Sequence, residues 1–152
     1  MNSHCLSIAS VPVQSWGPLY DRVQSLKNGT IFQDLDMPFF AADNSETGAV
    51  CWEPSKTADP QQQERETMML QIYQVSFVVD DLRLYLDTHP QDIQALEMLK
   101  NNLRQRKELL KNFAKQFYPL TMDCMADVEQ MGTEAGSYCW QEGPMPWEGA
   151  CV

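Results

Sequence analysis

Histidine is scarce in this chain, and the familiar catalytic patterns are missing. Only His4 and His89 occur among the 152 residues, so no acid–base relay or nucleophile–base pair can be assembled. The phosphate-binding patterns GxGxxG and GxxxxGK[ST] are absent. Asp80 and Asp81 are adjacent, so on a helix their side chains point about 100° apart and do not converge. The sequence therefore favours a protein that is not an enzyme, with no catalytic or cofactor-binding residue.

Basic residues and long apolar runs are also few. Lys and Arg number 11 against 21 acidic residues, and the net charge is −10. This charge argues against binding to nucleic acid or to anionic membranes and leaves a cationic partner open. No apolar run approaches the roughly 18–20 residues that span a bilayer. Met1 to Ser10 has no basic region followed by an apolar core, so we expect synthesis and retention in the cytosol.

Cysteines occur in an odd number and without CxxC spacing, which is not typical of a secreted disulfide framework. We expect free thiols outside the helical centre, available for intermolecular cross-linking: Cys5, Cys51, Cys124, Cys139 and Cys151. His4 and Cys5 are the only close pair of soft ligands, so no metal site is assigned. A thiol-based redox protein or a small metal-binding protein is the alternative interpretation. Reactive thiols at Cys139 and Cys151 would need electropositive surroundings, and the tail is acidic.

The centre of the chain carries the strongest periodic pattern. Apolar residues spaced by four and three predict a helix over 64–88: Met68, Ile72, Val75, Val79, Leu82 and Leu86. A second apolar stripe runs beside it: Leu70, Tyr73, Phe77 and Leu84. A third stripe predicts a helix over 92–118: Leu96, Leu99, Leu103, Leu110, Phe113 and Phe117. The predicted fold is mainly α, an antiparallel helical hairpin from about Glu64 to Tyr118.

The short connection between the two helices makes them antiparallel neighbours. Pro90 disfavours helical geometry at His89 and is well tolerated at the start of a helix. His89 is expected to pack in this turn, and Asp92 lies near the positive end of the second helix dipole. The predicted helices carry net charges of −3 and +3, so charge would favour their pairing. The basic run Arg104 to Lys107 would then face the first helix or an acidic tail.

The apolar face of the first helix is too wide for one partner helix to cover. The segments on both sides of the hairpin are mostly extended and rich in proline and aromatic residues, with a helical turn or two expected over Asp21 to Lys27, ended by Asn28-Gly29. These segments either cover that face or bind a partner. The candidate partner-binding residues are Trp16, Tyr20, Ile31, Phe32, Phe39, Phe40, Trp140 and Trp147. We predict an N-terminal segment over 1–42, a flexible linker over 43–63, and the hairpin with an extended acidic tail over 64–152.

The hairpin resembles the spore coat protein CotJB family. The similarity lies in Leu70 to Leu120, and its most specific part is the Tyr-Leu-Asp-Thr-His-Pro run from Tyr85 to Pro90. The terminal Glu142 to Glu148 resembles the Pro-Trp-Pro-Trp element that closes that family, with Met145 in place of a tryptophan. Residues 122–136 depart from the CotJB pattern.

The N-terminal segment is similar to a second family, the spore coat associated protein CotJA. The similarity rests on the Gly-Thr-Ile-Phe element, Gly29 to Phe32, and on Pro38 to Phe40. The chain thus resembles a fusion of the two families. The resemblance implies a structural spore coat protein, made in the mother-cell cytoplasm, that binds other coat proteins, including a manganese-catalase-like protein. It implies no cofactor, and a homo-oligomer is possible.

Overall fold

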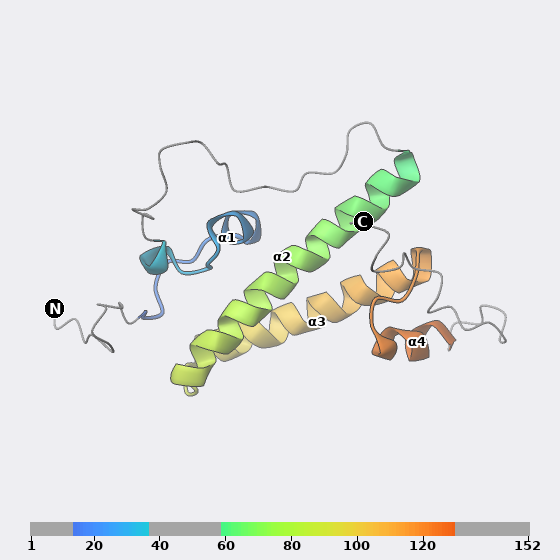
Figure 1. The fold of residues 1–152 in the computed structure, drawn as a ribbon. Coiled ribbons are helices and arrows are strands. Elements are labelled where there is room, and N and C mark those ends of the chain that lie inside the picture. The colour runs from blue at the N-terminus through green and yellow to red at the C-terminus, as the bar shows by residue number, and fades with distance from the viewer. Residues whose placement is uncertain (1–13, 37–58, 130–152) are drawn as a thin grey trace. The chain divides into compact units, whose positions relative to one another are not determined.

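The computed structural model describes residues 14–36 and 59–129 (Figure 1). Its elements are α1 (Arg22–Asn28), the 3-10 turn η1 (Gln33–Leu35), α2 (Pro60–Thr88), α3 (Ile93–Gln116) and α4 (Met122–Glu129). In the described part of the chain, the only β pairing is an isolated antiparallel bridge between Leu19 and Phe32. The predicted mainly α fold is confirmed, because α2 and α3 are long helices that pack against each other.

Both helices of the hairpin lie close to their predicted bounds. α2 ends at Thr88, as predicted, but begins at Pro60 instead of Glu64, and proline is well tolerated at a first helical position. α3 begins at Ile93 because Asp92 is its N-cap residue: the Asp92 Oδ1 atom accepts hydrogen bonds from the backbone N–H groups of Gln94 (3.0 Å) and Ala95 (3.1 Å). Pro90 lies in the turn before this cap.

Side chains from both helices close the turn. The Tyr85 hydroxyl donates a hydrogen bond to the Asp92 carboxylate at 2.9 Å, and the rings of Tyr85 and His89 stack with centroids 4.3 Å apart. The backbone N–H of His89 donates to the carbonyl of Tyr85 at 3.0 Å. Tyr85 therefore joins the end of α2 to the start of α3.

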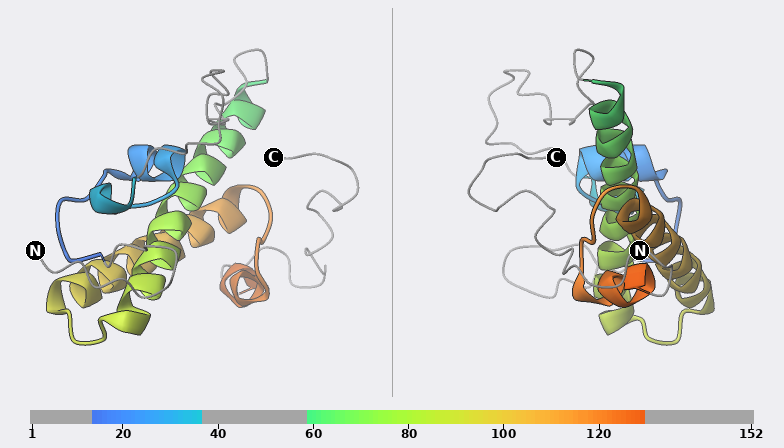
Figure 2. Two further views of the ribbon diagram at one scale, coloured as in Figure 1. Left: turned by 60° about the vertical axis from the view of Figure 1, so that its left-hand side comes forward. Right: turned by 90° about the vertical axis from the view of Figure 1, so that its right-hand side faces the viewer.

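The chain divides into two compact units. The first unit combines the N-terminal segment with Phe77–Leu99, the end of α2 and the start of α3. Figure 2 shows α1 and η1 beside α2. The core of the first unit consists of Ile31, Phe32, Val78, Leu82, Tyr85 and Ala95. The N-terminal segment thus supplies two of the six buried core residues.

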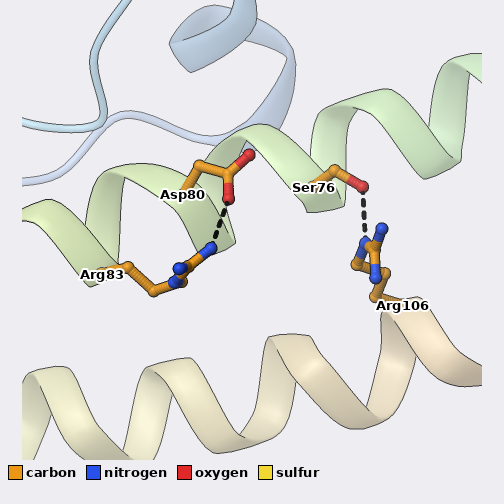
Figure 3. Close-up of polar contacts among 4 residues, drawn as sticks. All are labelled: Ser76, Asp80, Arg83 and Arg106. Carbon is orange, nitrogen blue, oxygen red and sulfur yellow. Dashed lines mark hydrogen bonds and ion pairs between the residues drawn. The ribbon is translucent and has the colours of Figure 1, made fainter.

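The second unit contains the start of α2, most of α3 and α4. Its core consists of Met69, Ile72, Leu110, Phe113, Ala114 and Cys124. The Phe113 ring packs against the rings of Phe117 and Tyr118, with centroids 5.0 and 5.3 Å away. The Arg106 side chain extends from α3 to α2, where its Nε–H donates to the Ser76 hydroxyl at 2.8 Å (Figure 3).

The buried face of the hairpin differs in detail from the predicted stripes. Met69, Val78 and Tyr85 are buried although no predicted stripe includes them, while Leu103 is exposed. Val78 and Tyr85 are covered by the N-terminal segment as well as by the hairpin. An apolar stripe identified for contact with one partner helix does not include the residues that a second element, the N-terminal segment, covers.

Candidate interaction site

Residues 18–36 form a compact element that we call the N-terminal clip. Asp21 begins α1, since its Oδ1 atom accepts hydrogen bonds from the backbone N–H groups of Val23 and Gln24, both at 2.9 Å. Gly29 ends α1 in the left-handed conformation (φ 80°), which glycine adopts without steric cost. The buried Ser25 hydroxyl donates to the Asp21 carbonyl at 2.6 Å. These caps turn the chain back on itself.

Hydrogen bonds across the turn hold the two ends of the clip together. The Tyr20 N–H donates to the Ile31 carbonyl at 2.9 Å, next to the Leu19–Phe32 bridge. The Asp36 carboxylate accepts from the Tyr20 hydroxyl at 2.8 Å and from the Asn28 side-chain amide at 3.0 Å. The hydrogen bond to Asp36 is the largest cause raising the pKa of Tyr20.

Asp81 of α2 receives the clip. Its Oδ2 atom accepts a hydrogen bond from the backbone N–H of Ile31 at 2.7 Å and another from the Thr30 hydroxyl at 3.2 Å. The Thr30 hydroxyl oxygen also accepts from the Phe32 N–H at 3.1 Å. A charged carboxylate therefore satisfies a backbone donor that would otherwise be buried without a partner.

Three aromatic rings pack against one another in the core of the first unit. The Phe32 ring lies 5.0 Å from the Tyr85 ring and 6.2 Å from the Trp16 ring, which it meets edge to face. Trp16 and Tyr85 are 5.6 Å apart. Ile31 is 0 % exposed and Phe32 is 2 % exposed. Burial, followed by the hydrogen bond to Asp92, raises the pKa of Tyr85.

The candidate partner-binding residues have different positions. Ile31 and Phe32 are in the core of the first unit, so in this conformation they have almost no surface left for another protein. Trp16 is half-buried against the same core, and Tyr20 is half-buried and bonded to Asp36. The other four lie outside the described residues: Phe39, Phe40, Trp140 and Trp147.

Sequence reasoning missed the role of Asp81, because it considered this residue only together with Asp80, as two carboxylates that do not converge on one site. Asp80 is exposed, and among the described residues it pairs with Arg83 alone, one turn further along α2 (3.4 Å, Figure 3). Asp81 instead contacts the clip. One signal was available: Asp81 follows Phe77 by four residues and precedes Leu84 by three, so it lies within the second apolar stripe. A carboxylate inside an apolar stripe indicates a buried donor opposite it.

Some of the excess apolar surface stays exposed. In the first unit Phe77 packs against the core, but Leu84 is 67 % exposed. In the second unit Tyr73 is 48 % exposed and Leu103 is 44 % exposed. In the first unit the core therefore includes Phe77 and leaves Leu84 accessible; in the second unit Tyr73 and Leu103 are accessible.

The basic run on α3 faces α2 at one residue only. Arg106 bonds to Ser76, whereas Lys100, Arg104, Lys107 and Lys115 are exposed and form no ion pair with any described residue. Among the described residues, no acidic side chain of α2 pairs with Arg104 or Lys107, and the alternative counterpart, an acidic tail, lies outside the described residues. The positions of Arg104 and Lys107 on α3 turn them towards solvent, where an acidic segment can reach them.

The one cysteine within the described ranges is not available for cross-linking, contrary to expectation. Cys124 is buried in the core of the second unit, with its sulfur 3.1 Å from the Thr121 hydroxyl. The other four cysteines and His4 lie outside the described residues. Within residues 14–36 and 59–129, no three His, Cys, Asp or Glu side chains cluster as a metal site would require. None of the described helices is long and apolar enough to cross a membrane.

A helical hairpin closed on one side by an N-terminal clip defines a small helical module with exposed apolar side chains. A family model described as CotJB protein matches residues 66–148, and one described as spore coat associated protein JA (CotJA) matches residues 6–39. The chain belongs to the CotJB family and carries a CotJA-like segment before it, which confirms the predicted fusion. The two families indicate a spore coat-associated protein. No curated protein and no solved structure matches the chain significantly.

Proposed function

We propose that this protein is a non-enzymatic structural component of the spore coat that acts by binding other coat proteins. It is made in the mother-cell cytoplasm, and one of its partners is a manganese-catalase-like coat protein. The matches to two coat-associated families on one chain support a location in the spore coat. The observation that carries the binding role is that each unit leaves a large apolar side chain of α2 exposed, Leu84 in the first unit and Tyr73 in the second.

The contribution of these side chains to the binding free energy can be estimated from the apolar area that a partner would bury. Full burial of a leucine or a similar side chain contributes about 1.5–3 kcal/mol. Leu84 and Tyr73 already hide part of their area, so we expect each to contribute about 1–2 kcal/mol, which is roughly tenfold in affinity. The aromatic residues Phe39, Phe40, Trp140 and Trp147 are proposed to add further contacts.

The test measures binding of the purified full-length chain to the manganese-catalase-like protein. Leu84→Ser and Tyr73→Ser should each weaken binding by about tenfold while leaving the helical circular dichroism unchanged. Val23→Ser is the matched control, because Val23 is also apolar and 57 % exposed but lies on α1. The flanks are tested with Trp140→Ala and Trp147→Ala, which should also weaken binding.

Two results would overturn the proposal. One is a folded chain that captures no coat protein, either this candidate or another, from an extract of sporulating cells. The other is unchanged affinity in the Leu84→Ser, Tyr73→Ser double variant. Sedimentation at several concentrations tests whether the same apolar surface also forms a homo-oligomer, which both substitutions should then weaken.

A further inference from the structure

We propose that the clip is a separable ligand of the hairpin, and that the surface around Asp81 and Tyr85 also binds such a clip on a different chain. The partner is defined by its chemistry: a CotJA-type polypeptide with a Gly-Thr-Ile-Phe turn. This inference concerns recognition between the two halves of the molecule and does not depend on the coat partner proposed above.

The boundaries of the two parts support separability. The CotJA family model ends at residue 39 and the CotJB family model starts at residue 66. The contact between clip and hairpin therefore joins two sequences that each define a family of their own. In this chain the contact is intramolecular only because one polypeptide carries both.

The hydrogen bonding also divides at this boundary. The described bonds inside the clip join residues at most 16 positions apart, such as Tyr20 and Asp36. Asp81 receives two long-range bonds from the clip, from Thr30 and Ile31, 51 and 50 positions away. A clip that supplies its own internal hydrogen bonds presents the same donors to Asp81 whether or not it is joined to α2.

The receiving surface is selective in two ways. The Asp81 carboxylate requires a backbone N–H with a hydroxyl beside it, which Ile31 and Thr30 provide. Next to it, the Tyr85 ring and the apolar side chains of α2 require an aromatic residue directly after that N–H, which is Phe32. A donor pair followed by a buried phenyl ring is a short signature that one peptide can carry.

Covalent connection favours the internal clip. Tethering gives a ligand an effective concentration on the order of millimolar when the connection can span the two sites. A separate CotJA-type chain at micromolar concentration therefore competes poorly with the tethered clip. Binding of the hairpin to a clip on a different chain should therefore become measurable when the connection within residues 43–58 is cut.

The experiment uses the full chain with a protease site inserted within residues 43–58. After cleavage, the two fragments should co-elute from a sizing column at micromolar concentration. A fluorescent peptide of residues 14–36 should then exchange into the cleaved protein, as measured by anisotropy. It should bind the uncut chain at least tenfold more weakly, because the tethered clip competes.

Asp81→Ala in the hairpin should weaken peptide binding by at least about tenfold, because the Ile31 N–H loses its acceptor. Asp80→Ala is the matched control: it removes the neighbouring carboxylate, which bonds to Arg83 and not to the clip (Figure 3). Thr30→Val in the peptide tests the same contact without altering the hairpin, and it should also weaken binding.

Separation of the cleaved fragments while the hairpin stays helical would overturn the proposal. So would equal effects of Asp81→Ala and Asp80→Ala, or equal binding of the native and Thr30→Val peptides. If Asp81→Ala unfolds the hairpin, binding of the Thr30→Val peptide to the unchanged hairpin decides the question.

Discussion

Replacing Phe32 with alanine distinguishes a core residue from a docking residue. From the sequence, Phe32 is a candidate for binding a partner. In the structure it is 2 % exposed and packs against Trp16 and Tyr85. We therefore expect Phe32→Ala to destabilise the first unit strongly, whether or not any partner is present.

The size of the effect follows from the burial of the ring. An aromatic side chain buries about 150–250 Å², which at about 25 cal/mol per Å² corresponds to about 4–6 kcal/mol. Alanine keeps the Cβ atom, and measured Phe→Ala substitutions in cores cost about 3–5 kcal/mol. Domains of this size are stable by only about 5–15 kcal/mol. A solvent-exposed docking phenylalanine would change stability by about 0.5 kcal/mol or less.

Hydrogen exchange of the backbone amides in the first unit measures this loss directly. A destabilisation of about 3–5 kcal/mol reduces the protection of amides that exchange by opening of this unit by roughly two to three and a half orders of magnitude. Val23→Ala, at an exposed position on α1, serves as the control and should leave protection nearly unchanged. A loss below about 1 kcal/mol for Phe32→Ala would refute the assignment of Phe32 to the core.

Three further predictions concern single positions. Gly29→Ala should lower the free energy of unfolding, measured by chemical denaturation, by about 1–2 kcal/mol. The cause is the left-handed backbone at this position, since an added Cβ would meet no neighbouring atom, and Gly29→Asn should cost less because asparagine tolerates this conformation better. Hydrogen bonds from Ala95, foremost, and from Tyr85 lower the pKa of Asp92 despite some desolvation. Its contribution to stability is therefore present above the pKa of the unfolded chain and lost as the pH falls through the folded pKa. Asp92→Asn should remove that part of the acid dependence of the thermal midpoint. Cys124 should stay unmodified by a thiol reagent until the second unit unfolds, and rapid modification in the native protein would favour the redox alternative.

The hairpin could be predicted because its signal is local. Spacings of three and four residues over α2 and α3 specify helices, and Asp92 after Pro90 marks the start of the second one. The first turn of α2, from Pro60 to Gln63, has no apolar periodicity, so its helical conformation could not be read from the pattern. The burial of Cys124 depends on α4 packing against Phe113, which the spacing of cysteines does not report.

The clip contact could not be predicted because it joins residues about fifty positions apart through one carboxylate. Periodicity describes which residues of one element share a face, but it does not say what covers that face. For Ile31 and Phe32 both covering and docking were open from the sequence, and the structure places them in the core. The only trace of this outcome in the sequence is Asp81 within an otherwise apolar stripe.

The position of the clip changes how the exposed surface is interpreted. A hairpin alone would expose Val78, Leu82 and Tyr85 in part, and any apolar segment could cover them. With the clip in place, that surface is occupied by a segment of the same polypeptide, one clip for each hairpin. Fusion therefore fixes a one-to-one ratio of the CotJA-like and CotJB-like parts, which separate chains would reach only through their affinity and concentrations. A partner that binds while the internal clip is in place, as proposed above, would recognise what the clip leaves exposed, such as Leu84. Substitutions in the clip core and at Leu84 should then have separable effects, on stability and on binding respectively.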